Sequence, residues 1–459
     1  MNILIVGNGF DLSHYLPTKY DHFMDAMGAI EKKDTGWLAQ NLEERSIDEL
    51  LRLINSIFEK RGDVEDEKQS MTFEELFIET KDPNFLAKTK ELYNTDKVVL
   101  TQKLVLEFQY RLAKNCWYQY FKKHVQDVKT WIDFEQKIEN ALVMISNFQN
   151  ILNEDFKNCG YIKEKFGFLK VSDNYRDKNF LYLAENHFDV LVLLKLCRKN
   201  IRKRSPSSEE GYIENRWFAV SESPKYGLNH QNYLSFLQVE LGEFIEIFNL
   251  YLERIVDKLE AKSQFKIEAE SWVMPDHIFS FNYTNTFQKF YSSTSTEFLH
   301  GCFGEEQNIV LGISDLEDEG LKKLKAYGFT KYHQKLFKDT NYLFLDECSQ
   351  VKKRILGAKP SAMGKGTKFI IWGHSLDKSD QEYIQEIFKL NDDRYIGVRV
   401  IVYYFNDKFA LLNNLLDILK KDKVEQWMKK GWLKFEPNPD IAKLNNIAPV
   451  ALPKVQQTV

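Results

Sequence analysis

The chain has 459 residues, which is enough for a large core and more than one structural unit. Its formal net charge of −4 does not give the basic field of a nucleic-acid-binding protein, and its longest apolar run, Val190–Leu194, is far shorter than the roughly twenty residues of a membrane span. The five cysteines lack a Cys-x-x-Cys pair, which excludes a zinc ribbon and favours reduced thiols in the cytoplasm.

The first expected element is a buried parallel strand, because Ile3–Val6 is a short β-branched run. It ends at Gly7-Asn8-Gly9, where a backbone without Cβ atoms turns sharply and approaches a ligand closely. Strands that run into glycine-rich turns often present N–H groups to phosphate, so Gly7 and Gly9 are expected to donate to a pyrophosphate. The dinucleotide fingerprint is incomplete, however, because Leu12 occupies its third glycine position. A tight turn without a ligand is the alternative.

The next helix is expected to begin late. Thr18 with Asp21 predicts a capping box, and apolar residues then recur at helical spacing through Met27. About nine residues of loop would then separate the glycine turn from this helix. The second strand with a terminal acid that a hydride-transferring Rossmann domain requires does not follow, so a dehydrogenase is not predicted.

Residues 24–275 have an almost entirely helical pattern, which predicts a large helical insertion after the first strand. Apolar residues recur on one helical face within Trp131–Ile145 and again within Tyr233–Leu252. The run Arg198–Arg204 is basic and lies in an expected exposed loop, Arg198–Tyr212. A solvated charge run is favoured there over contact with nucleic acid.

Strand patterns return after residue 276 and alternate with helical patterns, which predicts an α/β fold with a parallel sheet. The expected strands are His277–Phe281, Thr296–Leu299, Asn308–Leu311, Thr367–Trp372 and Arg399–Phe405, and the expected helices are Asn285–Tyr291, Leu321–Phe337, Asp380–Leu390 and Lys408–Leu419. Residues 1–23 and 276–437 are therefore predicted to form one Rossmann-like domain, with 24–275 as the insertion. The tail, 438–459, is expected to be loosely ordered.

Ligands of open α/β sheets bind beyond the carboxyl ends of the strands, so the residues after each predicted strand are candidate site residues. Polar or glycine-bearing turns follow four of the strands, at Gly7–Asp11, Asn282–Asn285, His300-Gly301 and Gly373–Asp377. Together these four turns predict a nucleotide site at one edge of the sheet.

Each turn also has a purely structural interpretation. Asn282 is of a residue type that often caps helices, and His300 before a glycine is typical of a hydrogen-bonded turn histidine. Ser379 with Glu382 predicts a capping box for the helix that follows the last of these turns. Asp377 and Asp380 would then complement the N-terminal dipole of that helix.

Four segments together resemble the AbiH family of bacteriophage abortive-infection proteins. They are GNGFDLSHYLPTKYDHF from Gly7, WIDFE from Trp131, LHGCFG from Leu299 and IIWGHSLDKSDQEYI from Ile370. The resemblance covers both ends of the chain in the family's order. It implies a role in defence against phage and a phage-derived trigger as a partner, and it leaves homo-oligomerisation open.

More distantly, the same turns resemble the SIR2-like fold that binds and cleaves NAD. In that resemblance the nucleotide loop corresponds to Gly7–Tyr20, the asparagine beside the nicotinamide ribose to Asn282, the catalytic His-Gly to His300-Gly301, and the adenosine-binding turn to Gly373–Leu376. The chain departs from the SIR2-like pattern at Asp11, Tyr20 and Thr284, where that pattern has serine, arginine and aspartate. The zinc-ribbon cysteines are also missing, so deacylation of acyl-lysine is not expected.

The leading hypothesis from these resemblances is hydrolysis of NAD to nicotinamide and ADP-ribose, with NAD as the substrate and no further cofactor or metal. Asn282 would orient the ribose and a water, and His300 with an ordinary pKa near 6.5 would act as a base toward a ribose hydroxyl or that water. Asp11 would orient the nicotinamide or stabilise developing positive charge, and Ser375 would contact the adenosine ribose or phosphate. The expected nucleotide-binding residues are Gly7, Asn8, Gly9, Phe10, Pro17, Thr18, Thr284, Gly301, Gly373, His374, Ser375 and Asp377.

Two other functions stay open. The same pocket in a sensor would bind NAD or a signalling nucleotide without turnover, and bound intact nucleotide in the purified protein would indicate it. A nuclease would need a metal-binding carboxylate cluster. Asp133 and Glu135 are two positions apart on a predicted helix, so they diverge and make a poor metal pair.

Overall fold

The fold is described from a computed structural model of the chain. It covers residues 1–35, 46–61, 69–124, 131–160, 165–167, 188–199, 210–220, 223–340, 344–345, 349–357, 366–392 and 397–445. The expected exposed loop Arg198–Tyr212 lies largely outside these residues.

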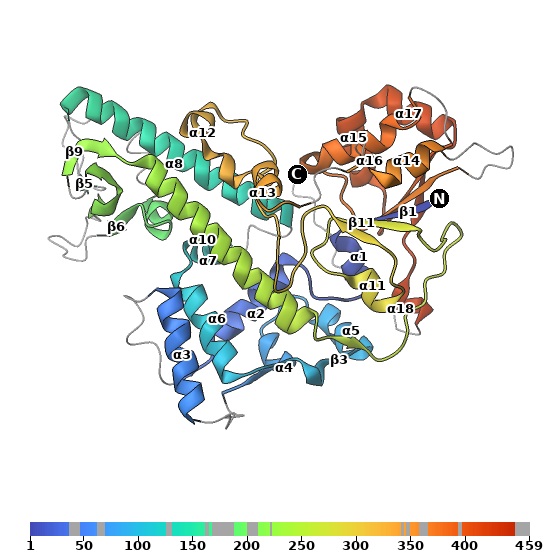
Figure 1. The fold of residues 1–459 in the computed structure, drawn as a ribbon, viewed down its shortest axis with the longest axis horizontal. Coiled ribbons are helices and arrows are strands. Elements are labelled where there is room, and N and C mark those ends of the chain that lie inside the picture. The colour runs from blue at the N-terminus through green and yellow to red at the C-terminus, as the bar shows by residue number, and fades with distance from the viewer. Residues whose placement is uncertain are drawn as a thin grey trace.

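A six-stranded, all-parallel sheet organises the molecule (Figure 1). In spatial order its strands are β12 (Thr296–Phe298), β11 (His277–Ser280), β1 (Asn2–Val6), β13 (Lys368–Trp372), β14 (Arg399–Tyr404) and β15 (Leu433–Pro437). The first strand is central: Ile5 pairs with Phe279 on one side and with Ile371 on the other. The predicted parallel sheet containing the N-terminal strand is therefore confirmed.

The two faces of the sheet pack against different parts of the chain because successive side chains of a strand point in opposite directions. Ile3 and Ile5 join the core beneath the C-terminal helices, whereas Leu4 and Val6 join the core shared with residues 24–275. The C-terminal helices are α14 (Gln350–Gly357), α15 (Gln381–Lys389), α16 (Phe409–Leu419) and α17 (Lys421–Lys429), which lie together beside the sheet in Figure 1. Each strand of the sheet centre is thus buried on both sides.

Besides the short helix that directly follows β1, the segment between β1 and β11 contains eight of the described α-helices. They are α2 (Tyr20–Lys32), α3 (Ile47–Arg61), α4 (Phe73–Leu76), α5 (Pro83–Leu92), α6 (Gln102–Lys114), α7 (Cys116–Lys123), α8 (Trp131–Cys159) and α10 (His230–Tyr251), which ends in a π-helical turn, Leu252–Val256. Short antiparallel strands also occur: β2 (Met71–Thr72), β3 (Tyr93–Asn94), β4 (Val99–Leu100), β5 (Lys165–Gly167), β6 (Cys197–Lys199), β7 (Glu210–Ile213), β8 (Phe218–Val220), β9 (Ser223–Leu228) and β10 (Glu260–Ala261). The expectation of an almost purely helical segment was wrong in this respect.

The predicted loop after the first strand is also wrong, because α1 (Asn8–Ser13) begins directly after Gly7. The following helix, α2, has Lys19 as its N-cap and no capping side chain. Thr18 instead donates to Asn8 Oδ1 at 2.8 Å, so its hydroxyl turns toward the glycine turn rather than toward α2.

Several smaller differences concern the second half of the chain. The expected strand Asn308–Leu311 joins no sheet, since its backbone bonds to the His300–Cys302 turn, and strand β15 was not predicted. The predicted long helix at 321–337 is divided into α12 (Glu319–Leu324), a 3-10 turn (Ala326–Phe329) and α13 (Lys331–Phe337). The remaining helix before the sheet edge is α11 (Thr286–Phe290), and residues 441–444 of the predicted tail form α18 (Ile441–Leu444).

Candidate functional site

A cavity of about 330 Å³ opens beyond the carboxyl ends of β1, β11 and β13. This volume lies within the usual range for small-molecule sites, about 300–1,000 Å³. Its polar lining comes mainly from the sheet and the residues that follow its strands, whereas Trp131, Phe248 and Leu252 of the 24–275 segment form an apolar part of the wall. The cavity therefore lies where the sheet and the inserted segment meet.

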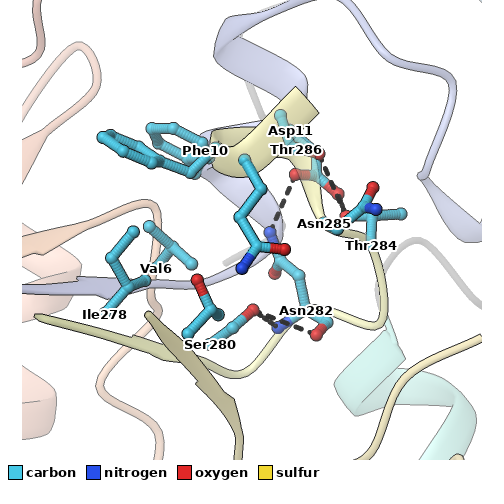
Figure 2. Close-up of a pocket in the computed structure, with 12 residues that line it drawn as sticks. Val6, Phe10, Asp11, Ile278, Ser280, Asn282, Thr284, Asn285 and Thr286 are labelled. Atoms are coloured by element: carbon cyan, nitrogen blue, oxygen red, sulfur yellow. Dashed lines mark hydrogen bonds between the residues drawn. The ribbon is translucent and has the colours of Figure 1, made fainter. Parts of the chain in front are cut away.

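Asp11 is the centre of the first polar cluster at this cavity. Figure 2 shows this cluster in a view of a small neighbouring pocket, which shares Asp11, Asn282 and Thr284 with the cavity. Its carboxylate accepts hydrogen bonds from Asn282 Nδ2 at 2.9 Å and from the Thr284 hydroxyl at 2.5 Å, and only 1 % of Asp11 is exposed. Burial raises the pKa of Asp11 to about 6, although its hydrogen bonds oppose the rise. The α1 helix and the turn after β11 thus hold one carboxyl group against neutral partners.

Asp380 is the centre of the second cluster. His300 Nε2 lies 3.1 Å from one of its carboxylate oxygens, and His374 Nε2 lies 3.3 Å from the other. His374 Nδ1 accepts the Leu376 N–H at 2.9 Å, so its proton is on Nε2 and faces Asp380. His300 Nε2 and Asp380 Oδ1 lie in contact without forming a hydrogen bond. The negative charge beside Nε2 still favours a proton there, so we place the His300 proton on Nε2, which leaves Nδ1 as the proton acceptor.

Two further charged side chains extend this second cluster. Lys331 Nζ lies 2.8 Å from Glu135 Oε1 and 4.0 Å from Asp380 Oδ1, and all three side chains line the cavity. Burial raises the pKa of Glu135 to about 7, against the pull of Lys331. Burial also opposes the ionisation of Asp380, but Lys331 and the two imidazoles together hold the pKa of that carboxyl well below its usual value.

The expectation that His300 has an ordinary pKa was wrong. Burial lowers the pKa of His300 to about 3, although the neighbouring Asp380 carboxylate opposes the shift. The imidazole is therefore neutral at physiological pH. Its unprotonated nitrogen can accept a proton, but burial makes it a weaker base than an ordinary histidine.

The glycine turn also differs from its expected role as a source of free donors. The N–H of Gly7 donates to the Trp372 carbonyl at 3.0 Å, and the N–H of Gly9 donates to the Gly373 carbonyl at 2.8 Å. A Cβ on Gly7 would lie 2.6 Å from the His374 Cα. These glycines therefore allow the turns after β1 and β13 to pack together, and their N–H groups are not directed to a ligand.

Comparison with known proteins identifies the family. A family model described as "Bacteriophage abortive infection AbiH" matches residues 3–404. The chain belongs to the AbiH family. Neither the curated proteins nor the solved structures give a significant match to it.

Membership in the AbiH family implies a role in abortive infection by phage. Among the described residues, every helix is too short or too polar to cross a lipid bilayer. The same part of the chain contains no group of three or more His, Cys, Asp or Glu side chains arranged to hold a metal ion.

The AbiH chain brings most of the predicted site residues to the cavity. Those that line it are Gly7, Asn8, Asp11, Thr18, Asn282, Thr284, His300, Gly373, His374 and Ser375. Gly9, Phe10, Pro17, Gly301 and Asp377 do not line it. Gly301 has a φ of +78°, and a Cβ there would lie 2.0 Å from the Asn308 carbonyl, so its place in the fold is a tight turn.

Asp377 and Ser379 correct the predicted capping box. Asp377 Oδ1 accepts the Ser379 N–H at 2.9 Å and so caps the short 3-10 turn Lys378–Asp380. Helix α15 then begins after Asp380 without a capping side chain, because that carboxylate faces the two histidines instead.

Residues that the sequence did not assign to the site are Glu135, Lys331 and the aromatic wall. Trp131 and Glu135 are four positions apart on α8, and both line the cavity. The WIDFE segment was a usable signal, since it is one of the AbiH-like motifs. Lys331 begins α13 after the Thr330 cap and has no comparable sequence signal.

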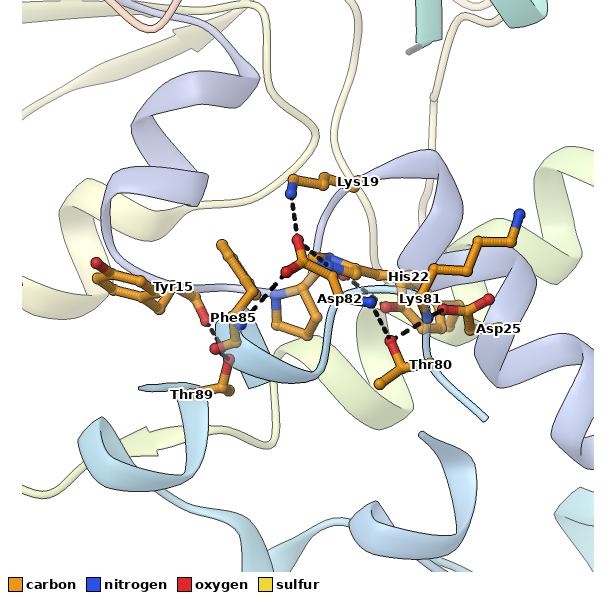
Figure 3. Close-up of polar contacts among 11 residues, drawn as sticks. Tyr15, Lys19, His22, Asp25, Thr80, Lys81, Asp82, Phe85 and Thr89 are labelled. Carbon is orange, nitrogen blue, oxygen red and sulfur yellow. Dashed lines mark hydrogen bonds and ion pairs between the residues drawn. The ribbon is translucent and has the colours of Figure 1, made fainter. Parts of the chain in front are cut away.

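A separate polar network fixes the cavity edge at Lys19 (Figure 3). Lys19 Nζ lies 2.6 Å from Asp82, which caps α5 through the Phe85 N–H. The neighbouring His22 and Lys19 hold the pKa of Asp82 well below its usual value. Thr80 and the Lys81 N–H both donate to Asp25 at 3.0 Å. This network joins α2 to α5, and we assign it a structural role.

Proposed function

We propose that this AbiH protein hydrolyses NAD to nicotinamide and ADP-ribose during abortive infection. The observation that carries the proposal is the pair formed by His300 and Asp380 in a cavity at the carboxyl edge of a parallel sheet. A carboxylate that faces one imidazole nitrogen orients the ring and stabilises the imidazolium that forms when the other nitrogen accepts a proton.

The reaction requires little covalent assistance. The bond between the ribose C1′ and the nicotinamide nitrogen breaks, its electron pair stays with the leaving nicotinamide, and C1′ acquires oxocarbenium character. A water oxygen then bonds to C1′, and the proton that it loses passes to His300 Nδ1 and from there to solvent. The products are nicotinamide, ADP-ribose and one proton.

Asn282 and Asp11 support the other half of this chemistry. Asn282 donates to Asp11, which fixes the amide at the cavity and leaves its carbonyl oxygen for a ribose hydroxyl or the attacking water. When Asp11 is ionised, its negative charge favours the oxocarbenium ion. The aromatic wall around Trp131 and Phe248 offers a surface for a planar base.

The experiment that tests this function is measurement of nicotinamide released from NAD by purified protein, alone and with lysate of phage-infected cells. We expect Asn282→Ala and His300→Ala each to lower the rate by roughly 10²-fold or more, the usual scale for a positioned acid–base group. Asn140→Ala and His333→Ala are matched controls because both residues are exposed and lie away from the cavity. Circular dichroism checks that each variant is folded.

A nucleotide sensor is the second candidate, and one observation favours it. Asn282 and Thr284 already donate to Asp11, so part of the polar lining is satisfied before any ligand enters. A protein that binds NAD, leaves it intact with infected-cell lysate and still protects cells would establish the sensor. Nicotinamide release that neither substitution changes would show that catalysis uses other residues.

A further inference from the structure

A series of charged contacts connects the inserted segment to the candidate catalytic histidine. Glu135 on α8 pairs with Lys331 on α13, Lys331 approaches Asp380, and Asp380 faces His300. The side chains of Glu135, Lys331 and Asp380 are 13 %, 7 % and 9 % exposed. Helix α8 therefore contributes an almost buried charge to the cluster. Of the other members, His300 follows β12, Asp380 follows β13, and Lys331 lies between these two strands in the chain.

The distances indicate what Glu135 does. Lys331 has two carboxylates within reach and lies closer to Glu135, at 2.8 Å, than to Asp380, at 4.0 Å. Asp380 Oδ1, the oxygen that Lys331 approaches, is also the oxygen 3.1 Å from His300. Without Glu135, Asp380 would be the nearest carboxylate to this buried ammonium among the described residues, with Asp377 acting from farther away. Unpaired buried charges are strongly unfavourable. Lys331 would then move onto Asp380 and compete with His300.

We propose that Glu135 is a positioning residue of the site that acts through Lys331. Helix α8 of the inserted segment then completes the site in addition to packing against the sheet. The expected effect of Glu135 on the rate of nicotinamide release rests on the proposed NAD hydrolysis. Its expected effect on His300 does not. The charged groups that face His300 are Asp380, Lys335 and Lys331, and those that face Glu135 are Lys331, Asp380 and Asp377.

The kinetic test compares Glu135→Gln with Glu139→Gln, which makes the same change one turn later on α8 and away from the cavity. We expect Glu135→Gln to lower kcat for nicotinamide release by about 10- to 100-fold and to change KM by less than about threefold, because misplacing a catalytic group affects the transition state most. Glu135→Asp should recover part of the loss. An unchanged kcat in Glu135→Gln, or an equal loss in Glu139→Gln, would overturn the proposal.

A second test does not depend on activity. Nitrogen NMR of the His300 imidazole at pH 7 should show a shifted resonance in Glu135→Gln and in Lys331→Met but not in Glu139→Gln. Lys331→Met should also raise the pKa of His300 by about one unit, because it removes a nearby positive charge.

The double variant Glu135→Gln/Lys331→Met shows whether Glu135 acts on His300 through Lys331 or independently of it. It also keeps the test open if Glu135→Gln alone fails to fold. It leaves neither charge of the pair unpartnered, so we expect it to fold. Its His300 resonance should match that of Lys331→Met alone. A further shift caused by Glu135→Gln in that background would contradict the proposal. If the wild type releases no nicotinamide, the proposed function fails while these NMR results still decide the role of Glu135.

Discussion

Asp11 and Asp380 are two almost completely buried carboxyl groups at one cavity, yet their pKa values move in opposite directions. Asp11 is surrounded by an amide and hydroxyl groups, and burial raises its pKa to about 6. Asp380 is also buried, but it is surrounded by Lys331 and two imidazoles, which hold its pKa well below the usual value. The charge of the neighbours, and not burial alone, therefore decides the ionisation of each carboxyl group. Such a divergence within one site is typical of acid–base assignments in enzymes.

The largest effect is expected from Asp380→Asn. The amide keeps the size of the side chain but cannot stabilise an imidazolium at His300, so we expect kcat for nicotinamide release to fall by roughly 10³-fold. Lys331 retains Glu135 as a partner, so the variant should remain folded. Steady-state kinetics and calorimetric NAD titration are the measurements. A kcat within about tenfold of the wild type would show that the His300–Asp380 pair is not the catalytic element.

Asp11→Asn should have a smaller effect of a different kind. In the wild type, kcat/KM is expected to fall as the pH drops below about 6, because Asp11 gains a proton and loses the charge that favours the oxocarbenium ion. The asparagine variant should be about tenfold slower at pH 8 and should lack this acid limb. A pH–rate profile from pH 5 to 8 provides the comparison, and an unchanged limb in the variant would assign it to another group, with Glu135 the first alternative.

The sequence predicted part of this site because parallel strands end at one edge of a sheet. Asn282, His300 and Ser375 are far apart in the chain, but each follows a predicted strand, and all three line the cavity. The sheet order itself was not predicted, nor was β15. The sequence provides no register for pairing strands that are separated by more than 250 residues.

Other features of the site depend on packing that no local pattern encodes. Glu135 and Lys331 meet only because α8 and α13 bring them together, and the sequence separates them by almost 200 positions. The low pKa of His300 follows from burial, which is a property of the folded chain. The glycine turn shows the same limit: its residue types were compatible with phosphate binding, but its N–H groups bond to the turn after β13.

The smallest effect is predicted for a substitution of His14. It tests whether the AbiH-like segment around Asp11 also contributes to the stability of the fold. His14 is completely buried, its Nδ1 donates to the Phe10 carbonyl at 2.7 Å, and its Nε2 accepts from the Tyr291 hydroxyl. Burial lowers its pKa from 6.5 to about 4. Between those two pH values the unfolded chain binds a proton that the folded chain does not bind. The free energy of unfolding should therefore decrease as the pH falls from about 6.5 to about 4, by up to roughly 3 kcal/mol for this one group.

The variant His14→Asn removes the titrating group and keeps a polar side chain of similar reach. Denaturant unfolding at pH 7 and at pH 4.5 measures the result: the wild type should be the more stable protein at pH 7, and its advantage should shrink at pH 4.5. Because His14 does not line the cavity, nicotinamide release at pH 7 should stay within about threefold of the wild-type rate. An advantage that is the same at both pH values would mean that His14 gains its proton over the same pH range in the folded and the unfolded chain, so that folding does not lower its pKa. A large loss of rate would place His14 in the site together with Asp11.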